Sequence, residues 1–214
     1  MGNLLHWGRL VADSVSRIVA ERWRRPVATY RIQFKKGQCA FRDAADIVPY
    51  LDQLGVSDLY ASPYLKTRLG SPHGYAIVDY SELDPALGGA GEYRRLIDAL
   101  RQHGMGQIID VVSNHMSATP GENLWWTNVL ENGPSSPYAV YFDIDWNPIK
   151  EELQNKLLLP VLGDQYGQVL ESGDLKLVYR DGAFLVHYFE TNLPLDPRTY
   201  RVILARGFGD LKEK

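Results

Sequence analysis

Apolar and polar side chains recur along the chain with two different periods, and these periods predict its first elements. Residues 27–34 (VATYRIQF) alternate between apolar and polar, which is typical of a strand with one buried face. The apolar positions that follow have the spacing of a helix, namely Phe41, Ala44, Ala45 and Val48. Pro49 should kink or restart this helix because its ring removes a backbone donor, and Gly55 is a suitable end.

The order of strand and helix repeats further along the chain. Residues 57–62 (SDLYAS) are predicted to form a second short strand, which a long polar connection follows. A second helix, ended by Gly104, is predicted from the apolar positions Tyr93, Leu96, Ile97 and Leu100. Residues 107–112 (QIIDVV) are apolar in succession, as in a strand of a parallel sheet that is covered on both faces. The alternation predicts an α/β fold with right-handed parallel crossovers.

Residues 1–25 form a segment of their own. Its apolar residues lie at helical spacing (Leu4, Val11, Val15 and Ile18), and its charged residues alternate in sign at every fourth position (Arg9, Asp13, Arg17 and Glu21). This pattern predicts an amphipathic helix, either packed on the body of the protein or acting as a loose leader. Both are favoured over a helix that lies on a membrane surface.

Composition narrows the class of protein. The chain has 214 residues, of which 45% are hydrophobic and 23% charged, and its formal net charge is −3, so we expect a soluble globular protein without a nucleic-acid partner. No apolar run is long enough to cross a bilayer. Its single cysteine, Cys39, excludes an internal disulfide and suits a reducing, cytoplasmic location. No metal-ligand spacing surrounds it, and no metal or cofactor is expected.

Residues 110–116 (DVVSNHM) begin as a buried strand and then turn abruptly polar. In parallel α/β folds the chemistry gathers at the carboxyl ends of the strands, because the loops there vary while the sheet holds their roots. Asp110, Asn114 and His115 are therefore candidate site residues.

These residues also carry a resemblance. The spacing Asp110-x-x-x-Asn114-His115 resembles the first conserved motif of the α-amylase superfamily, which ends the third strand of a (β/α)₈ barrel. Residues 70–80 (GSPHGYAIVDY) resemble the sugar-stacking Gly-Tyr segment of that superfamily, and residues 84–106 resemble the passage that joins it to the third strand. Within the superfamily, four stretches are similar to the maltooligosyltrehalose synthases: residues 28–34, 60–75, 123–146 and 158–177.

The resemblance implies a fold with three parts. Residues 1–25 are the helix or leader, residues 26–115 the first three strands of a partial TIM (β/α)₈ barrel, and residues 116–214 an incomplete inserted α+β domain. A β-hairpin is predicted in this insertion, because LKLVY (175–179) and FLVHYF (184–189) flank the turn residues Asp181 and Gly182.

The implied function is that of the amino-terminal part of an isomerase. Such an enzyme converts the reducing-end α-1,4 linkage of a maltooligosaccharide to an α,α-1,1 linkage by intramolecular transglucosylation. Its substrate is an α-1,4-glucan, and no partner protein is evident. The alternatives are a part of another glucan hydrolase or transferase of the superfamily, or a non-catalytic glucan-binding module.

The resemblance also implies roles for individual residues. Tyr75 resembles the aromatic platform beneath a glucose unit, and His115 resembles the histidine that donates to a hydroxyl of the same unit. Asp110 more plausibly braces the site than reacts, and Asn114 matches a calcium ligand of many amylases, although no oxygen cage around it can be identified. The remaining candidates flank Tyr75 and could support it or touch sugar: His73 and Asp79. Some aromatic residues of the insertion are expected to line glucose subsites, from the set Trp125, Trp126, Tyr138, Tyr141, Phe142 and Trp146.

No catalytic residue is assigned. A retaining glycosidase mechanism needs two carboxyl groups about 5 Å apart. The expected G-[FY]-R-x-D nucleophile motif does not occur, and VYRDG (178–182) has the wrong spacing. The chain is therefore expected to be a fragment that is inactive alone, with inward-facing side chains such as Ile109 and Val111 left uncovered.

Overall fold

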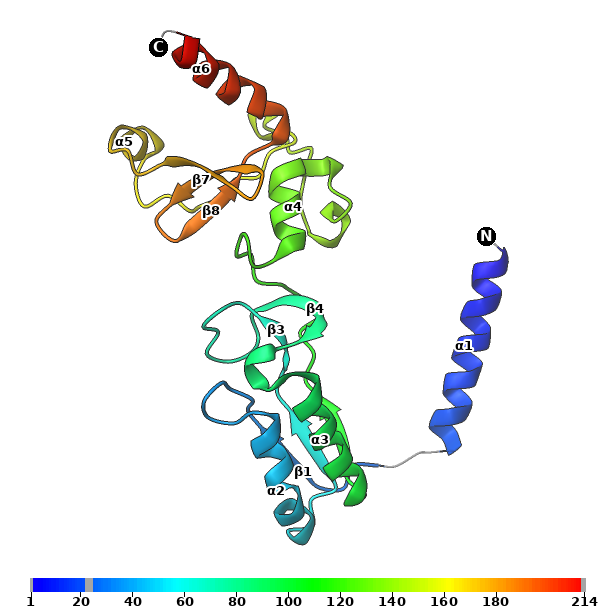
Figure 1. Cartoon of the computed structure of the whole chain (residues 1–214). Coiled ribbons are helices and arrows are strands. Elements are labelled where there is room, and N and C mark those ends of the chain that lie inside the picture. The colour runs from blue at the N-terminus through cyan, green and yellow to red at the C-terminus, as the bar shows by residue number, and fades with distance from the viewer. Residues whose placement is uncertain (1, 22–24, 213–214) are drawn as a thin grey trace. The chain divides into compact units, whose positions relative to one another are not determined.

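The computed structural model describes residues 2–21 and 25–212, and its contacts divide the chain into two compact units (Figure 1). The first unit contains the chain up to Ser62 together with Ala86–Asp110. The second contains Pro63–Pro85 together with the chain from Val111 onward. This grouping differs from the predicted boundary at residue 115, because the connection after the second strand packs with the segment that follows Asp110.

A three-stranded parallel sheet forms the centre of the first unit. Its strands are β1 (Thr29–Ile32), β2 (Asp58–Ala61) and β5 (Gly106–Ile109), in the spatial order β1-β2-β5. The predicted parallel βαβαβ order is therefore confirmed. The third strand is shorter than predicted, since it ends at Ile109 and the segment from Asp110 to Val112 lies beyond it.

Two helices, α2 (Phe41–Gln53) and α3 (Gly89–Gln102), lie side by side against this sheet (Figure 1). The Phe41 ring packs on Phe34, with ring centroids 5.3 Å apart, and both side chains are buried. The predicted helical positions Leu96 and Leu100 are buried on α3. Burial of these apolar stripes is the main source of the stability of this unit.

Of the two predicted effects of Pro49, a restart of the helix is wrong, because α2 runs through the proline without interruption. Val48 and Leu51 are buried on either side of Pro49. The packing of these side chains keeps the helix continuous although Pro49 has no backbone N–H to donate. The predicted end at Gly55 is confirmed. Gly55 has a φ of 82°, and the next N–H, that of Val56, donates to Leu51 O at 3.0 Å, as in a Schellman motif.

The outer strand β5 leaves apolar surface exposed. Ile109 is 45% exposed, and Val111, just beyond the strand, is 60% exposed, so the prediction that both lack cover is confirmed. Ile109 pairs with Ala61, so the two side chains lie on the same face of the sheet. Leu59 and Ala61 share this face and are both fully buried. Tyr60 and Ile108 occupy the opposite face.

The amino-terminal helix α1 (Gly2–Glu21) confirms the predicted helix. All of its described side chains, Arg9–Ile18, are exposed, so the apolar positions Val11 and Ile18 are not covered by the described part of the protein. The side chains of Leu4 and Glu21 lie outside the described residues. No helix within the described residues is long and apolar enough to cross a membrane.

The second unit begins with an antiparallel pair, β3 (Leu65–Thr67) and β4 (Ile77–Leu83). The long polar connection predicted after the second strand therefore contains two strands that the sequence pattern did not indicate. Ile77 and Val78 are buried at the start of β4. The free energy of their burial offsets the low strand propensity of the polar residues in the rest of this strand.

The remainder of the second unit contains helices and a three-stranded antiparallel sheet. Helix α4 (Leu124–Asn132) precedes the sheet, whose strands are β6 (Lys176–Arg180), β7 (Ala183–Tyr188) and β8 (Thr191–Pro194). The predicted hairpin is confirmed, with Asp181 at φ 52° and Gly182 at φ 83°, as a type I′ turn requires. The remaining helices are α5 (Tyr166–Glu171) and α6 (Tyr200–Lys212), with short 3₁₀ turns at Pro85–Leu87, Gly133–Ser135, Ala139–Tyr141, Glu151–Leu153 and Pro197–Thr199.

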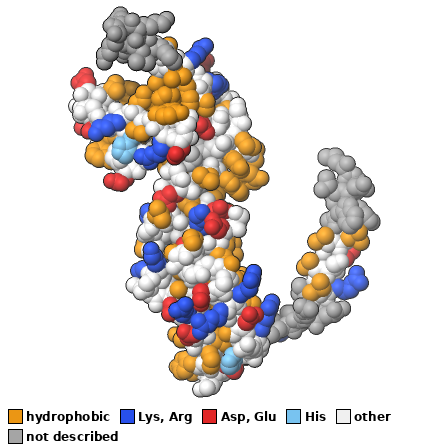
Figure 2. Space-filling view, viewed as in Figure 1, with side chains coloured by type: hydrophobic (Ala, Val, Ile, Leu, Met, Phe, Trp, Pro, Cys, Tyr) orange, Lys and Arg blue, Asp and Glu red, His pale blue; other side chains and the backbone are white. Residues whose placement is uncertain are grey.

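Charges of both signs are mixed on the helices of the first unit, on the face that Figure 2 shows. Arg95 contacts Asp46, and Arg42 lies 3.5 Å from Glu92, so the exposed side chains of α2 and α3 are cross-linked by ion pairs.

Candidate functional site

Strand β4 holds the segment that carries Asn114 and His115. The Tyr80 hydroxyl lies 2.7 Å from Val112 O and 2.8 Å from His115 O, so its single proton is shared between two backbone acceptors. The N–H of Ser117 donates to Ile77 O at 2.7 Å. One strand therefore fixes both ends of this polar segment within the second unit.

The imidazole of His115 is oriented by its neighbour. His115 Nδ1 lies 3.1 Å from Asn114 Oδ1, and both side chains are exposed. Because an amide oxygen only accepts hydrogen bonds, Nδ1 carries the hydrogen, and Nε2 is the atom left for other partners. A neutral His115 then accepts a hydrogen bond at Nε2, whereas a protonated His115 donates one.

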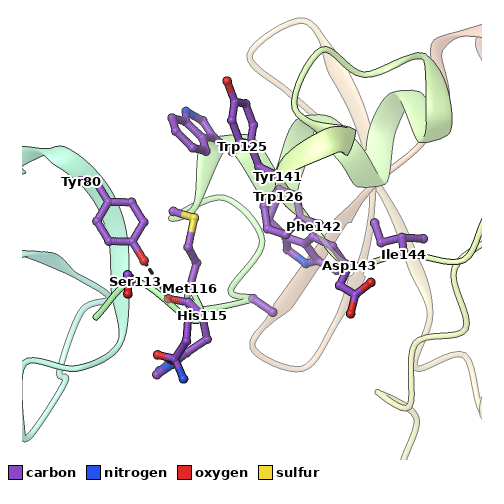
Figure 3. Close-up of a pocket in the computed structure, with 12 residues that line it drawn as sticks. Tyr80, Ser113, His115, Met116, Trp125, Trp126, Tyr141, Phe142, Asp143 and Ile144 are labelled. Carbon is purple, nitrogen blue, oxygen red and sulfur yellow. Dashed lines mark hydrogen bonds between the residues drawn. The ribbon is translucent and has the colours of Figure 1, made fainter. Parts of the chain in front are cut away.

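A cavity of about 470 Å³ opens beside this segment (Figure 3). Tyr80, His115 and Met116 lie on one side of it in the close-up, and Trp126 and Phe142 lie on the other. Its polar lining comes from the predicted segment and from Asp143, and its apolar lining comes chiefly from aromatic rings. Such a mixture is typical of sites that bind small molecules.

The aromatic wall is built by α4 and the turn that follows it. Trp125 stacks on Tyr138 at 5.3 Å with an interplanar angle of 12°, and it contacts Tyr141 at 5.0 Å. Trp126 packs on Phe142 at 5.1 Å. Trp125, Trp126, Tyr141 and Phe142 line the cavity, whereas Tyr138 and Trp146 are not among its lining residues.

Asn123 joins the aromatic wall to the His115 segment. Its Oδ1 caps α4 by accepting from Trp126 N at 3.0 Å, and its Nδ2 donates to Ser117 O at 2.9 Å. The side chain is fully buried. Asn123 was not among the predicted site residues, although an Asn directly before a helix is a recognisable N-cap signal.

Three predicted residues of the second unit lie outside the lining of this cavity. Tyr75 lies in the loop between β3 and β4, its N–H donates to His73 Nδ1 at 3.0 Å, and the centroids of the two rings lie 5.7 Å apart. The Asp79 carboxylate accepts from Ser81 N at 2.8 Å and from Ser81 Oγ at 2.6 Å. These hydrogen bonds hold the pKa of Asp79 below its usual range.

Asp110, the sixth predicted residue, lies in the first unit. Its N–H donates to Ala61 O at 2.9 Å, which extends the β2–β5 ladder by one hydrogen bond. Its backbone thus has a structural role at the carboxyl end of the strand.

Tyr80 also lines the cavity. It was not among the predicted site residues, although it stands directly after the predicted Asp79. Burial raises the pKa of its hydroxyl. The group therefore stays protonated, and able to donate, throughout the neutral range.

No three His, Cys, Asp or Glu side chains within residues 2–21 and 25–212 are arranged to hold a metal ion. Burial also raises the pKa of the half-buried Cys39 thiol, and the Asp43 carboxylate adds to this effect. A thiol in this state is a poor ligand and a poor nucleophile.

Comparisons with known proteins identify relatives of this chain. A putative maltooligosyl trehalose synthase of Mycobacterium tuberculosis is 40% identical over 170 residues, which cover 73% of this chain and 22% of the relative. The structure of maltooligosyltrehalose synthase from Arthrobacter ramosus superposes with a TM-score of 0.70 at 41% identity, covering 81% of this chain and 22% of that one. A hypothetical maltooligosyl trehalose synthase of Sulfolobus tokodaii gives a TM-score of 0.68 at 34% identity, covering 83% and 23%.

The predicted resemblance to the maltooligosyltrehalose synthases is thus confirmed, and this chain spans about a fifth of the length of these relatives. The intracellular maltogenic amylase of Bacillus subtilis is more distant, at 35% identity over 108 residues that cover 50% of this chain and 17% of that enzyme. The model of the α-amylase catalytic domain matches residues 41–194. The chain therefore belongs to the α-amylase family, in the catalytic domain of that family.

Proposed function

We propose that this chain forms part of the glucan-binding cleft of an enzyme of the maltooligosyltrehalose synthase type. The whole enzyme would convert the reducing-end α-1,4 linkage of a maltooligosaccharide to an α,α-1,1 linkage by intramolecular transglucosylation. The observation that carries the proposal is the cavity that brings His115 and Asn114 together with Trp126 and Phe142. The 41% identity to a synthase of known structure supports the choice of reaction.

The chemistry of the cavity suits a glucosyl unit. Flat aromatic rings pack on the C–H faces of a sugar, and polar side chains bond its hydroxyls. His115 would bond a hydroxyl through Nε2, as the acceptor when neutral and as the donor when protonated. Asn114 would orient His115 rather than hold calcium.

Outside the cavity, we propose supporting roles for the other predicted residues. Tyr75 would serve as a platform beneath a glucose unit, held by the contact of its N–H with His73. Asp79 would fix the backbone at Ser81, and Asp110 would brace the end of β5. None of these residues is assigned a catalytic step.

The whole enzyme would contain a complete (β/α)₈ barrel. Strands β1, β2 and β5 would be the first three strands of a (β/α)₈ barrel, and residues 116–214 would be the domain inserted after the third. The catalytic carboxylates would come from outside the matched positions, since Asp181 of VYRDG lies in a hairpin turn. A cytoplasmic location is proposed from the single cysteine alone.

The test is to titrate the ¹⁵N-labelled chain with maltopentaose and to follow its amide and indole resonances. We expect shifts at residues 113–116 and at the indoles of Trp125 and Trp126. His115→Ala should weaken binding by about fivefold, as loss of one hydrogen bond implies. His103→Ala is the matched control, because His103 pairs with Asp52 on the surface of the first unit. Shifts that miss residues 113–116, or no shift at millimolar glucan, would overturn the proposal.

The same incubation tests for catalysis. We expect neither hydrolysis nor a non-reducing product from the pure chain. Clear turnover would show that carboxylates within residues 1–214 are sufficient for catalysis. It would overturn the proposal that the catalytic carboxylates come from outside the matched positions.

A further inference from the structure

The turn between β7 and β8 holds an aromatic side chain in an unusual backbone conformation. The register of these strands leaves Phe189 and Glu190 as a two-residue turn, and Phe189 has a φ of 47°, in the left-handed region. The other non-glycine residues with a positive φ in the described part of the chain are Asn155 and Asp181. Asn and Asp tolerate this conformation because their short polar side chains bond the nearby backbone, whereas a bulky aromatic residue does not. Strained residues of this kind cluster at sites that hold ligands.

The packing of Phe189 does not account for this strain. The residue is 66% exposed, and its ring lies edge-on to the neighbouring Tyr188 ring, with the centroids 4.7 Å apart. Tyr188 is buried, and its hydroxyl accepts from the N–H of Gly163 at 2.9 Å, so Tyr188 already fixes the end of β7 to the rest of the second unit. Because an exposed ring gains little from burial, glycine would form this turn at a lower cost in free energy. The ring therefore has a role other than folding.

A small cavity of about 130 Å³ lies beside this ring. Its lining residues are Asp174, Lys176, His187 and Phe189. Lys176 and His187 are direct partners in the β6–β7 register, so their side chains share one face of the sheet. His187 Nδ1 lies 2.9 Å from Asn192 Oδ1 on β8. Because an amide oxygen only accepts hydrogen bonds, Nδ1 carries the hydrogen, and Nε2 is left for another partner.

The polar groups of this cavity match a neutral ligand that bears hydroxyl groups. Lys176 supplies a donor, and Asp174 supplies acceptors in a carboxylate that the Ser172 hydroxyl orients at 2.7 Å. With a neutral His187, one ammonium group and one carboxylate leave no net charge to select an ion. The cavity, at about 130 Å³, is smaller than a site that encloses a drug-sized ligand, which is about 300 to 1,000 Å³. It therefore suits part of one sugar ring.

We propose that this cavity and the ring of Phe189 bind one terminal glucosyl unit of an α-glucan, at a site separate from the cavity beside His115. Among the described residues, the two cavities share no lining residue. The ring of Phe189 would pack on a C–H face of the sugar. Lys176, His187 and Asp174 would bond its hydroxyls. This inference goes beyond the proposed function because it adds a second site, and it rests on that function for the identity of the sugar.

The experiment is a titration of the ¹⁵N-labelled chain with glucose and with maltopentaose, followed through its amide resonances. We expect residues 174–176 and 187–190 to shift with both sugars at similar affinity, since one glucosyl unit fills the cavity. Phe189→Gly should weaken this binding by about tenfold, as the loss of one stacked ring implies, and should leave the shifts at residues 113–116 unchanged. The same variant should not unfold at a lower urea concentration than the parent chain, because glycine relieves the left-handed turn.

Two variants serve as matched controls. Asp181→Gly relieves the left-handed residue in the turn between β6 and β7, and Tyr179→Ala removes an exposed ring that is not among the lining residues. Both should bind sugar at residues 174–176 as the parent chain does.

Parent-like affinity in Phe189→Gly would overturn the second site. A lower unfolding midpoint in that variant would show that the ring serves the fold, and would overturn it as well. Shifts at residues 113–116 without shifts at residues 174–176 would overturn the second site and leave the proposed function standing. Shifts in neither segment would overturn both.

Discussion

The hydroxyl of Tyr80 donates to the backbone carbonyl of His115 across 2.8 Å, although the two residues are 35 positions apart. Through this contact, and the equivalent one to Val112 O, strand β4 sets the position of the segment that bears the imidazole. The ring of Tyr80 lines the cavity at the same time. Tyr80 is therefore a positioning residue for His115.

Replacing Tyr80 by Phe should loosen the His115 segment while keeping the ring. We expect the variant to shift the His115 amide and imidazole resonances and to bind maltopentaose about fivefold more weakly, since one hydrogen bond contributes about 1 kcal/mol. Tyr179→Phe is the control, because Tyr179 is exposed on β6. A Tyr80→Phe variant whose His115 resonances stay in place would show that Tyr80 does not position the imidazole.

The raised pKa of Tyr80 makes a prediction for alkaline solution. Because burial favours the neutral phenol in the folded state, its contribution to stability is fully present below the ordinary pKa of about 10. That contribution is lost as the pH rises through the folded-state pKa. Urea unfolding of the parent chain and of Tyr80→Phe, at pH 8 and pH 11, should give a smaller loss of stability in the variant. Equal losses would contradict the burial of this hydroxyl.

Ser81 should control the titration of Asp79. Ser81→Ala removes the hydroxyl that holds the Asp79 carboxylate at 2.6 Å and should raise the pKa of Asp79 toward its ordinary value. Since the depressed pKa stabilises the fold above the unfolded-state pKa of about 4, the variant should lose less stability than the parent as the solution is acidified. Carboxyl ¹³C titration measures the shift. Asp196, whose pKa is lowered by Arg198, is the internal reference and should not move.

Asn123→Ala should destabilise the second unit. The substitution removes the cap of α4 and leaves Ser117 O without its donor, so we expect a loss of about 1 to 3 kcal/mol. Because the same side chain anchors Trp126, the fluorescence of this unit should also change. Asn147→Ala is the control at an exposed Asn. A stability loss no larger than that of the control would argue against the cap.

The exposed edge of β5 should drive association of the isolated chain. An uncovered strand edge with apolar side chains is a template for pairing with another chain. Ile109→Lys places a charge on this edge and should reduce the concentration dependence of the sedimentation coefficient. Val140→Lys adds the same charge at another exposed apolar site and should have no such effect. A parent chain that stays monomeric at high concentration would remove the basis for this prediction.

The sequence by itself determined the parallel strand order, the helix end at Gly55 and the hairpin at Asp181 and Gly182. Each depends on a local pattern: a period of burial, or a backbone conformation that few residues adopt. The sequence also determined the resemblance to the synthases, because motifs such as Asp110-x-x-x-Asn114-His115 lie within a few residues. It did not predict the β3–β4 pair, whose short strands carry polar residues that resemble a loop.

Only the tertiary structure decided which side chains share a cavity with His115. Asp79 and Tyr80 are neighbours in sequence, but successive residues of a strand point to opposite faces. Asp79 therefore bonds Ser81, while Tyr80 reaches His115. The choice between the two faces depends on which segment packs against β4, and that segment lies more than 30 residues away. A local pattern carries no information about such a contact, because its free energy exists only after both segments have folded together.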